Sequence, residues 1–285
     1  MSHSKKVTTN NFDTRIKEWD ELTLADNFIF QKVMLNEDLC KKILSEILGT
    51  EVTSIEYPDY EKTIAIRRDS KAIRLDIHIK GDDSIYNIEI QNADSPFLPL
   101  RERYYADLID LDFLEKGHDY EELGRNFVIF ICTFDHFGLD YYKYTFSNKC
   151  NEVSGLELGD KTTKILLNTY GKKGDVSDDL KDFLKAVNGI FSNSEFSATI
   201  KSEVDKVKSS NHLRREYMNL YIHDQDLRKA VTKEVTEKVM QKDIITLIKV
   251  SRDLGASQKI TVAKIMENYS LPENEVIALV TENWG

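Results

Sequence analysis

The sequence has few of the residues and segments that mark the special classes of protein. Four prolines and 12 glycines in 285 residues exclude collagen-like and low-complexity chains. Three cysteines, Cys40, Cys132 and Cys150, are too few and too far apart for a disulfide framework or a zinc site. No run approaches the roughly 18 apolar residues of a membrane-spanning helix, and no apolar run follows the basic N-terminal residues. We therefore expect a cytoplasmic protein without a membrane anchor.

Positive charge is also in short supply. The chain has 39 Lys and Arg against 49 Asp and Glu, a formal net charge of −10, which argues against binding nucleic acid by bulk charge. Residues 61–150 carry half of this excess, because 12 basic and 17 acidic groups there give −5. Such a region can be a solvated acidic surface or can contain a metal site, and charge alone favours the surface.

The hydrophobic pattern predicts an α/β fold. Apolar residues between Leu24 and Leu48 follow helical spacing, as one helix or as two with a break near Leu35, and Gly49 supplies a stop. Three β-branched runs between residues 61 and 92, separated by polar turns, are typical of an antiparallel meander. The elements expected next are a helix over 100–116, a buried strand over 126–134, strand-like runs over 141–147 and 163–168, and a helix over about 177–187.

This order of elements divides the chain into three regions. Residues 1–20 are polar and form an N-terminal arm, residues 21–193 form the core, and residues 194–285 form an all-helical C-terminal extension. The last 22 residues hold one lysine against four glutamates, which is a poor composition for a DNA-reading helix. We expect the extension to pack or to join copies of the chain into a homo-oligomer.

Alternation places two carboxylates on one face of neighbouring strands. Asp76 shares a face with His78, and Glu89 shares a face with Asn87 and Gln91. If the two strands pair through the short turn between them, Asp76 and Glu89 lie close together. Neighbouring carboxylates repel unless a cation or proton joins them, and such oxygen ligands suit Mg²⁺ or Mn²⁺. The other interpretation is an ordinary hairpin with a solvated polar face.

The same residues resemble a known nuclease core. Asp76, followed after a gap of 12 residues by Glu89-Ile90-Gln91, resembles the PD-(D/E)xK core in its Asp…Glu-x-Gln form. The segment Arg101-x-x-Tyr104-Tyr105 and the upstream Leu-Ala-Asp-Asn-Phe-Ile-Phe of residues 24–30 are similar to segments of the PD-(D/E)xK family transposases, the Rpn-type recombination-promoting nucleases. The resemblance spans roughly residues 22–235. It implies a restriction-endonuclease-like α/β core of helix, three-stranded meander, helix and strand.

The resemblance also implies roles for individual residues. Asp76 and Glu89 would hold a divalent metal ion, Mg²⁺ or alternatively Mn²⁺ or Ca²⁺, with the carbonyl of Ile90 as a third ligand. Gln91 stands where the core usually has lysine, and it offers hydrogen bonds without a full charge. On this basis Gln91→Lys is expected to keep or raise activity.

Three further residues are candidates for the site. Asp26 is an accessory catalytic acid in this interpretation, and the alternative is an N-cap of the helix that follows it. Arg101 would contact a phosphate of the substrate. Tyr105 would either donate a hydrogen bond near the site or fill the core.

The function implied is a metal-dependent endonuclease that hydrolyses phosphodiester bonds of DNA in transposition or recombination. The expected substrate is DNA, with RNA as the alternative. The alternative is a catalytically inactive chain that keeps the fold for nucleic-acid binding or assembly. The retained Asp76, Glu89 and Gln91 favour the enzyme, whereas the net charge of −10 and the missing lysine favour the alternative.

Overall fold

The structure is a computed structural model, which describes residues 17–57, 63–64, 73–74, 77–81, 83–114, 119–269 and 271–284. Contacts divide the chain into two compact units, one ending at Tyr217 and one beginning at Met218. No helix in the described ranges is both long and apolar enough to cross a membrane.

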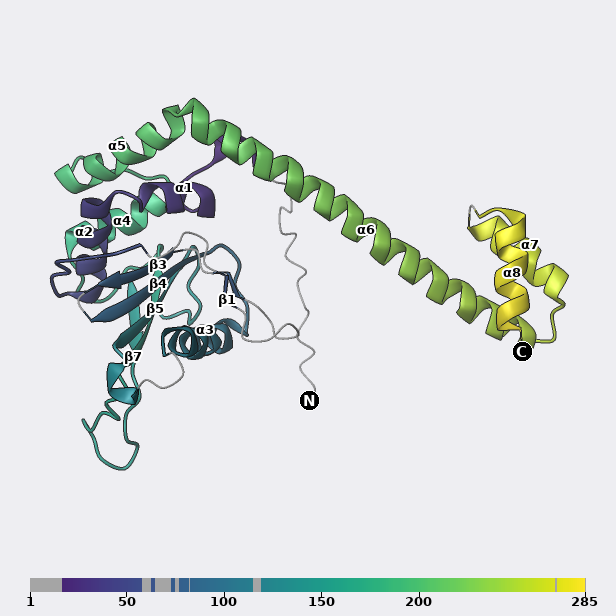
Figure 1. The fold of residues 1–285 in the computed structure, drawn as a ribbon, viewed down its shortest axis with the longest axis horizontal. Helices are drawn as coiled ribbons and strands as arrows, with labels where there is room; N and C mark the ends of the chain where they lie inside the picture. The colour runs from purple at the N-terminus through teal and green to yellow at the C-terminus, as the bar shows by residue number, and fades with distance from the viewer. Residues whose placement is uncertain are drawn as a thin grey trace. The chain divides into compact units, whose positions relative to one another are not determined.

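A mixed five-stranded sheet forms the centre of the first unit (Figure 1). Its strands are, in spatial order, β3 (Ile77–Gly81), β4 (Ser84–Gln91), β5 (Arg125–Cys132), β7 (Thr162–Asn168) and β6 (Lys143–Phe146). The strands β4, β5 and β7 are parallel, and the edge strands β3 and β6 run antiparallel to their neighbours. A separate pair, β1 (Thr63–Ile64) and β2 (Ile73–Arg74), is also antiparallel. The predicted antiparallel pairing of the β-branched runs is therefore found wherever the structure describes them.

Helices cover both faces of the sheet (Figure 1). Helix α3 (Leu98–Phe113) lies on one face, where Tyr105 and Ala106 pack in one buried cluster with Val128 and Phe130 of β5. Helices α1 (Asn27–Val33), α2 (Glu37–Leu48) and α4 (Asp178–Val187) lie on the opposite side. The α/β class and the helix–strand–helix–strand order predicted from the sequence are confirmed.

Local sequence signals set the ends of several helices. The side chain of Asn36 accepts a hydrogen bond from Leu39 N–H and starts α2, and Gly49 ends this helix at a φ of +74°. The predicted break near Leu35 is therefore found. Helix α3 begins two residues before its predicted start, with a proline in its first turn. It ends at Phe113, three residues before its predicted end.

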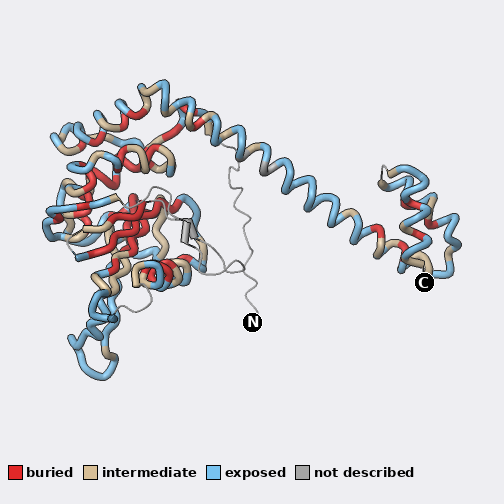
Figure 2. Tube along the Cα trace, viewed as in Figure 1, coloured by how far each residue is buried: buried red, intermediate tan, exposed pale blue. Residues whose placement is uncertain are grey.

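The first unit includes helix α5 (Glu195–Ser209), which the sequence assigned to the extension. Trp19, in the short helical turn η1 (Trp19–Glu21), is 2% exposed and donates its indole N–H to the carbonyl of Lys208 at 3.2 Å. Its ring contacts Phe28 of α1 and Tyr217. Figure 2 shows the buried residues continuing from the sheet into these helices. Burial of aromatic surface thus joins the arm, α1 and α5, a connection that hydrophobic periodicity does not reveal.

The second unit is helical, as the sequence predicts. Helix α6 (Asn211–Asp253) begins in the first unit and continues into the second, followed by α7 (Gln258–Asn268) and α8 (Glu273–Asn283). The small core of this unit consists of Ile244, Ile248, Ile265, Val276 and Val280.

Candidate active site at the end of strand β4

Strand β4 is buried along its whole length, including its polar side chains. The exposed fractions of Asn87, Glu89 and Gln91 are 0%, 3% and 7%. Glu89 is in register with Phe130 of β5, so both side chains point to the face that α3 covers. The interpretation of these residues as an ordinary solvated hairpin face is therefore wrong. The carboxylate of Glu89 is buried under α3 and is not exposed to solvent.

The surroundings of Glu89 suit a divalent cation. Asn87 donates to Glu89 Oε1 over a long 3.4 Å, and burial of a carboxylate is costly unless a partner compensates it. The amide oxygen of Asn87 is also buried, and no described residue donates a hydrogen bond to it. Carboxylate and amide oxygens are the hard ligands that Mg²⁺ and Ca²⁺ prefer. The residues present thus fit a metal ion at this position.

The two other predicted metal ligands are the side chain of Asp76 and the main-chain carbonyl of Ile90. Asp76 lies outside the described residues, and directly after it Ile77 pairs with Ile88. Ile90 is 5% exposed, and by alternation its side chain points to the face opposite Glu89. Within the described part of the chain, no three His, Cys, Asp or Glu side chains gather to hold a metal ion.

Gln91 is joined to the helix above it. Its Oε1 accepts a hydrogen bond from Arg101 Nη1 at 2.9 Å, and Arg101 Nη2 donates to the hydroxyl of Tyr105 at 3.2 Å. The guanidinium also lies 5.6 Å and 5.7 Å from the ring centres of Tyr105 and Phe130. The structure therefore brings three of the predicted site residues, Gln91, Arg101 and Tyr105, into one contact group.

A second acid lies beside this group. Glu102, the residue after Arg101, is 2% exposed, and burial raises the pKa of its carboxyl to about 8 against the opposing charge of Lys164. Burial likewise raises the pKa of the Cys132 thiol to about 12, reinforced by the negative charges of Glu102 and Asp94. At the end of β4 and β5, under α3, burial thus favours the neutral forms of the Glu102 carboxyl and the Cys132 thiol.

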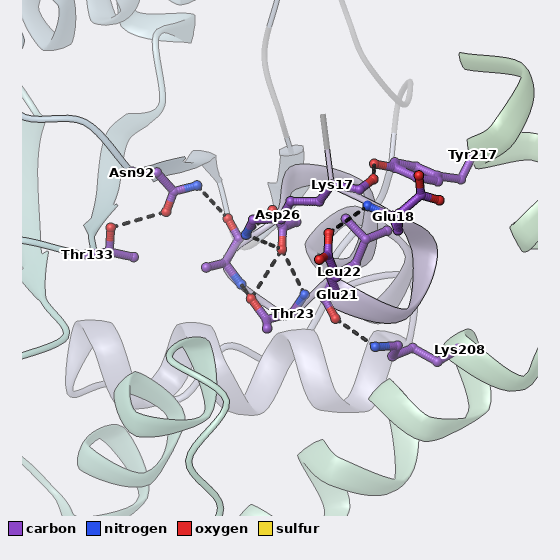
Figure 3. A network of polar contacts seen from close by, with 11 residues as sticks. Lys17, Glu18, Glu21, Leu22, Thr23, Asp26, Asn92, Thr133, Lys208 and Tyr217 are labelled. Atoms are coloured by element: carbon purple, nitrogen blue, oxygen red, sulfur yellow. Dashed lines mark hydrogen bonds and ion pairs between the residues drawn. The ribbon is translucent and has the colours of Figure 1, made fainter. Parts of the chain in front are cut away.

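Asp26 is held in a different set of contacts (Figure 3). Its Oδ2 accepts hydrogen bonds from the Thr23 N–H at 2.8 Å and from Lys17 Nζ at 3.0 Å. Asp26 occupies the N-cap position of α1, but its side chain makes no capping hydrogen bond. The carbonyl of the preceding residue, Ala25, accepts a hydrogen bond from Asn92 Nδ2 at 2.8 Å. The start of α1 therefore lies against the end of β4.

The loops that follow β4 and β5 are tied together at the same edge. The carbonyl of Gln91 accepts from Thr133 N–H at 3.0 Å, and Asn92 Oδ1 accepts from Thr133 Oγ1 at 3.2 Å. Beyond them, Asp94 Oδ1 lies 2.7 Å from His136 Nδ1. Sequence reasoning missed this pair, because 42 residues separate its members. The sequence signal that could have revealed the pair is its position after two buried strands. Asp94 follows Gln91 by three residues, and His136 follows Cys132 by four.

This architecture and these residues define a chain of the PD-(D/E)XK type, and the comparison of families agrees. Residues 27–169 match the PD-(D/E)XK nuclease family transposases, and the chain belongs to this family. The predicted family is therefore confirmed. Comparisons with curated proteins and with solved structures gave no match. Members of the family are of nuclease type, which implies a nucleic-acid substrate, and PD-(D/E)XK nucleases generally use divalent metal ions.

Proposed function

We propose that the chain is a metal-dependent endonuclease that hydrolyses phosphodiester bonds of DNA in transposition or recombination. Membership of the family supports a nuclease function. The observation that carries the proposal is the buried carboxylate of Glu89 two residues from Gln91, with Arg101 within 2.9 Å of the Gln91 amide. A carboxylate buried two residues from a side chain that is hydrogen-bonded to a guanidinium is an arrangement suited to metal and phosphate binding.

In this proposal Asp76 and Glu89 hold the metal ion, together with the carbonyl of Ile90. Support for Asp76 comes from its place in the sequence, directly before Ile77. Ile77 in turn pairs with Ile88, the residue before Glu89. A bound Mg²⁺, or Mn²⁺ or Ca²⁺ in its place, would activate water and offset negative charge on the phosphate.

Arg101 and Gln91 act on the substrate as a pair. Glutamine at position 91 has no full charge, but the Arg101 guanidinium lies directly beside it. The Arg101 guanidinium presents several hydrogen-bond donors in one plane, so it binds and orients a phosphate. Tyr105 holds the guanidinium in place through its hydroxyl and its ring.

Asp26 is proposed as an accessory acid at the edge of the site. It precedes α1, and its neighbour Ala25 is hydrogen-bonded to Asn92, the residue after Gln91. Thr23 and Lys17 orient its carboxylate.

The second candidate function is nucleic-acid binding or assembly without catalysis. The net charge of −10 and the uncharged Gln91 favour it. The C-terminal helices would serve assembly, since Ile260 and Ile277 are 62% and 47% exposed and a hollow of about 370 Å³ lies between α7 and α8. Sedimentation of the whole chain tests this homo-oligomer directly. We further propose a cytoplasmic location, where free thiols such as those of Cys40 and Cys132 persist.

Thermal unfolding in the presence of metal tests the proposed site apart from catalysis. Mg²⁺ or Mn²⁺ that binds the folded chain raises the melting temperature by mass action. Asp76→Asn should lose most of that rise, whereas Glu157→Gln, a change at an exposed loop residue, should keep it. Equal rises in Asp76→Asn and wild type would contradict the metal site.

A further inference from the structure

The pair formed by Asp94 and His136 lies at the edge of the sheet where the proposed site is. The last registered pair of β4 and β5 is Gln91 and Cys132, and the two residues of interest follow it in adjacent loops. The Thr133 contacts with Gln91 and Asn92 join these loops at their base. The position of His136 is therefore fixed relative to the strand that carries Glu89.

Asp94 determines which nitrogen of the His136 ring carries the proton. A carboxylate only accepts hydrogen bonds, so the 2.7 Å contact requires a proton on Nδ1. In the neutral ring Nε2 is then the nitrogen with a lone pair. The ring is also held edge-to-face against Phe137 at 4.9 Å. The side chain of His136 is 14% exposed, so the ring is held in place but remains in contact with solvent.

The other titratable groups around His136 are less suited to accept a proton. Asp135, in the same loop, accepts hydrogen bonds from Asp140 N–H at 2.7 Å and from the Tyr144 hydroxyl of β6 at 2.9 Å. Burial alone would raise the pKa of Asp135, but these bonds hold it below its usual range. The guanidinium of Arg101 on α3 only donates hydrogen bonds. His78 faces α3 from β3 and is 3% exposed, so it is closed to a substrate.

We propose that His136, oriented by Asp94, accepts the proton of the water that attacks the phosphodiester. This inference rests on the proposed nuclease function. Gln91 occupies the position of the usual lysine and has no group that takes up a proton at neutral pH. His136, in the loop after β5, provides such a group. It accepts the proton either directly or through one bridging water.

The step conserves atoms and charge. A lone pair of the water oxygen forms the new bond to phosphorus, and the water proton moves to His136 Nε2. The bond from phosphorus to the leaving oxygen breaks, and its electron pair stays on that oxygen, which takes a proton from solvent. The imidazolium, stabilised by the Asp94 carboxylate, then returns its proton to solvent.

The test compares wild type with His136→Asn in nicking of supercoiled plasmid DNA with Mg²⁺ between pH 5.5 and 9. Asparagine keeps an N–H that can reach Asp94, so the contact between the loops remains while Nε2 is removed. We expect the wild-type rate to fall on the acid side of this range, because a protonated Nε2 has no lone pair to accept the water proton. We expect His136→Asn to be slower by about 10²–10⁴-fold and to lack this acid limb, with an unchanged melting temperature.

Two further variants distinguish a role of His136 as proton acceptor from a purely structural role. In His136→Ala, added imidazole should restore part of the rate, whereas it should not affect His136→Asn. His212→Asn, at an exposed position of α6, should behave as wild type. Cleavage by His136→Asn at the wild-type rate with the wild-type pH profile would overturn this inference and leave the nuclease proposal standing. A wild type that does not cut with Mg²⁺ or Mn²⁺ would overturn both.

Discussion

The amide oxygen of Gln91 on β4 accepts a hydrogen bond of 2.9 Å from the guanidinium of Arg101 on α3. Gln91, the residue that replaces the usual lysine, thus lies against the positive charge of Arg101. This contact changes what a substitution at position 91 is expected to do, because any positive charge placed there meets the charge of Arg101.

Gln91→Lys, which the sequence predicts to keep or raise activity, should therefore lower the stability of the folded protein. Two like charges at this partly buried place repel, and we expect a loss of about 1–3 kcal/mol in the free energy of unfolding. Arg101→Gln in the same chain should recover most of the loss. Urea denaturation of the two single variants and the double variant measures this coupling. A Gln91→Lys variant as stable as wild type would show that the Arg101 contact is not maintained.

Glu102 makes stability depend on pH. The pKa of its carboxyl is about 8 in the folded chain against an ordinary value of 4.5, so the folded state keeps a proton that the unfolded state releases. Its contribution is therefore fully present below a pH of about 4.5 and declines as the pH rises to about 8. The decline is on the order of 4 kcal/mol.

The variant Glu102→Gln removes this titration and should be more stable than wild type at pH 8 and similar at pH 5. Asp107→Asn, an exposed change on the same helix, is the matched control and should keep the wild-type dependence. Thermal unfolding measured at both pH values checks the prediction. Parallel wild-type and Glu102→Gln curves would mean that the carboxyl ionises normally.

The first unit should need α5 and the start of α6 to fold. A chain that ends at residue 193 loses the buried side chains Ile200, Val204 and Val207 and also the ring of Tyr217 that packs on Trp19. Each lost large side chain removes about 2–5 kcal/mol. A chain that ends at residue 217 keeps them all. We expect cooperative unfolding by circular dichroism for the longer chain alone, and equal melting temperatures for the two would contradict this division.

The proposed catalytic role of Asp26 can be tested by comparing substitutions of Asp26 and of Lys17, its ion-pair partner. Asp26→Asn and Lys17→Met both remove the ion pair at 2.7 Å and should each cost about 1 kcal/mol or less, because the pair is partly exposed. Lys17→Met retains the carboxylate. Plasmid nicking should then fall more than tenfold in Asp26→Asn and less than threefold in Lys17→Met. Equal rates in the two variants would assign Asp26 a structural role only.

Periodic elements were predictable from the sequence, and their boundaries less so. The alternation in β4 and the apolar run of β5 identified both strands, since each carries its own pattern. The burial of Glu89 was not predictable, because it depends on α3 covering a face that the polar residues alone suggest is solvated.

The candidate site was predictable only where its residues lie close together in the sequence. Glu89, Gln91 and Arg101 lie within 13 residues of one another, so a local motif brings them to notice. His136 and Asp94 meet only because β4 and β5 are parallel neighbours, a pairing that no local pattern specifies. Likewise, the place of α5 in the first unit follows from contacts with Trp19 and α1, far away in sequence.

The central claim is that Glu89 is a metal ligand of a working nuclease, and the rate of plasmid nicking by Glu89→Gln in Mg²⁺ tests it most directly. Glutamine preserves the volume of this buried side chain, so circular dichroism should match wild type, with Glu157→Gln as the control for an exposed acid. We predict a fall in rate of at least about 10²-fold, since a carboxylate ligand is lost. Nicking by Glu89→Gln at the wild-type rate would contradict the account.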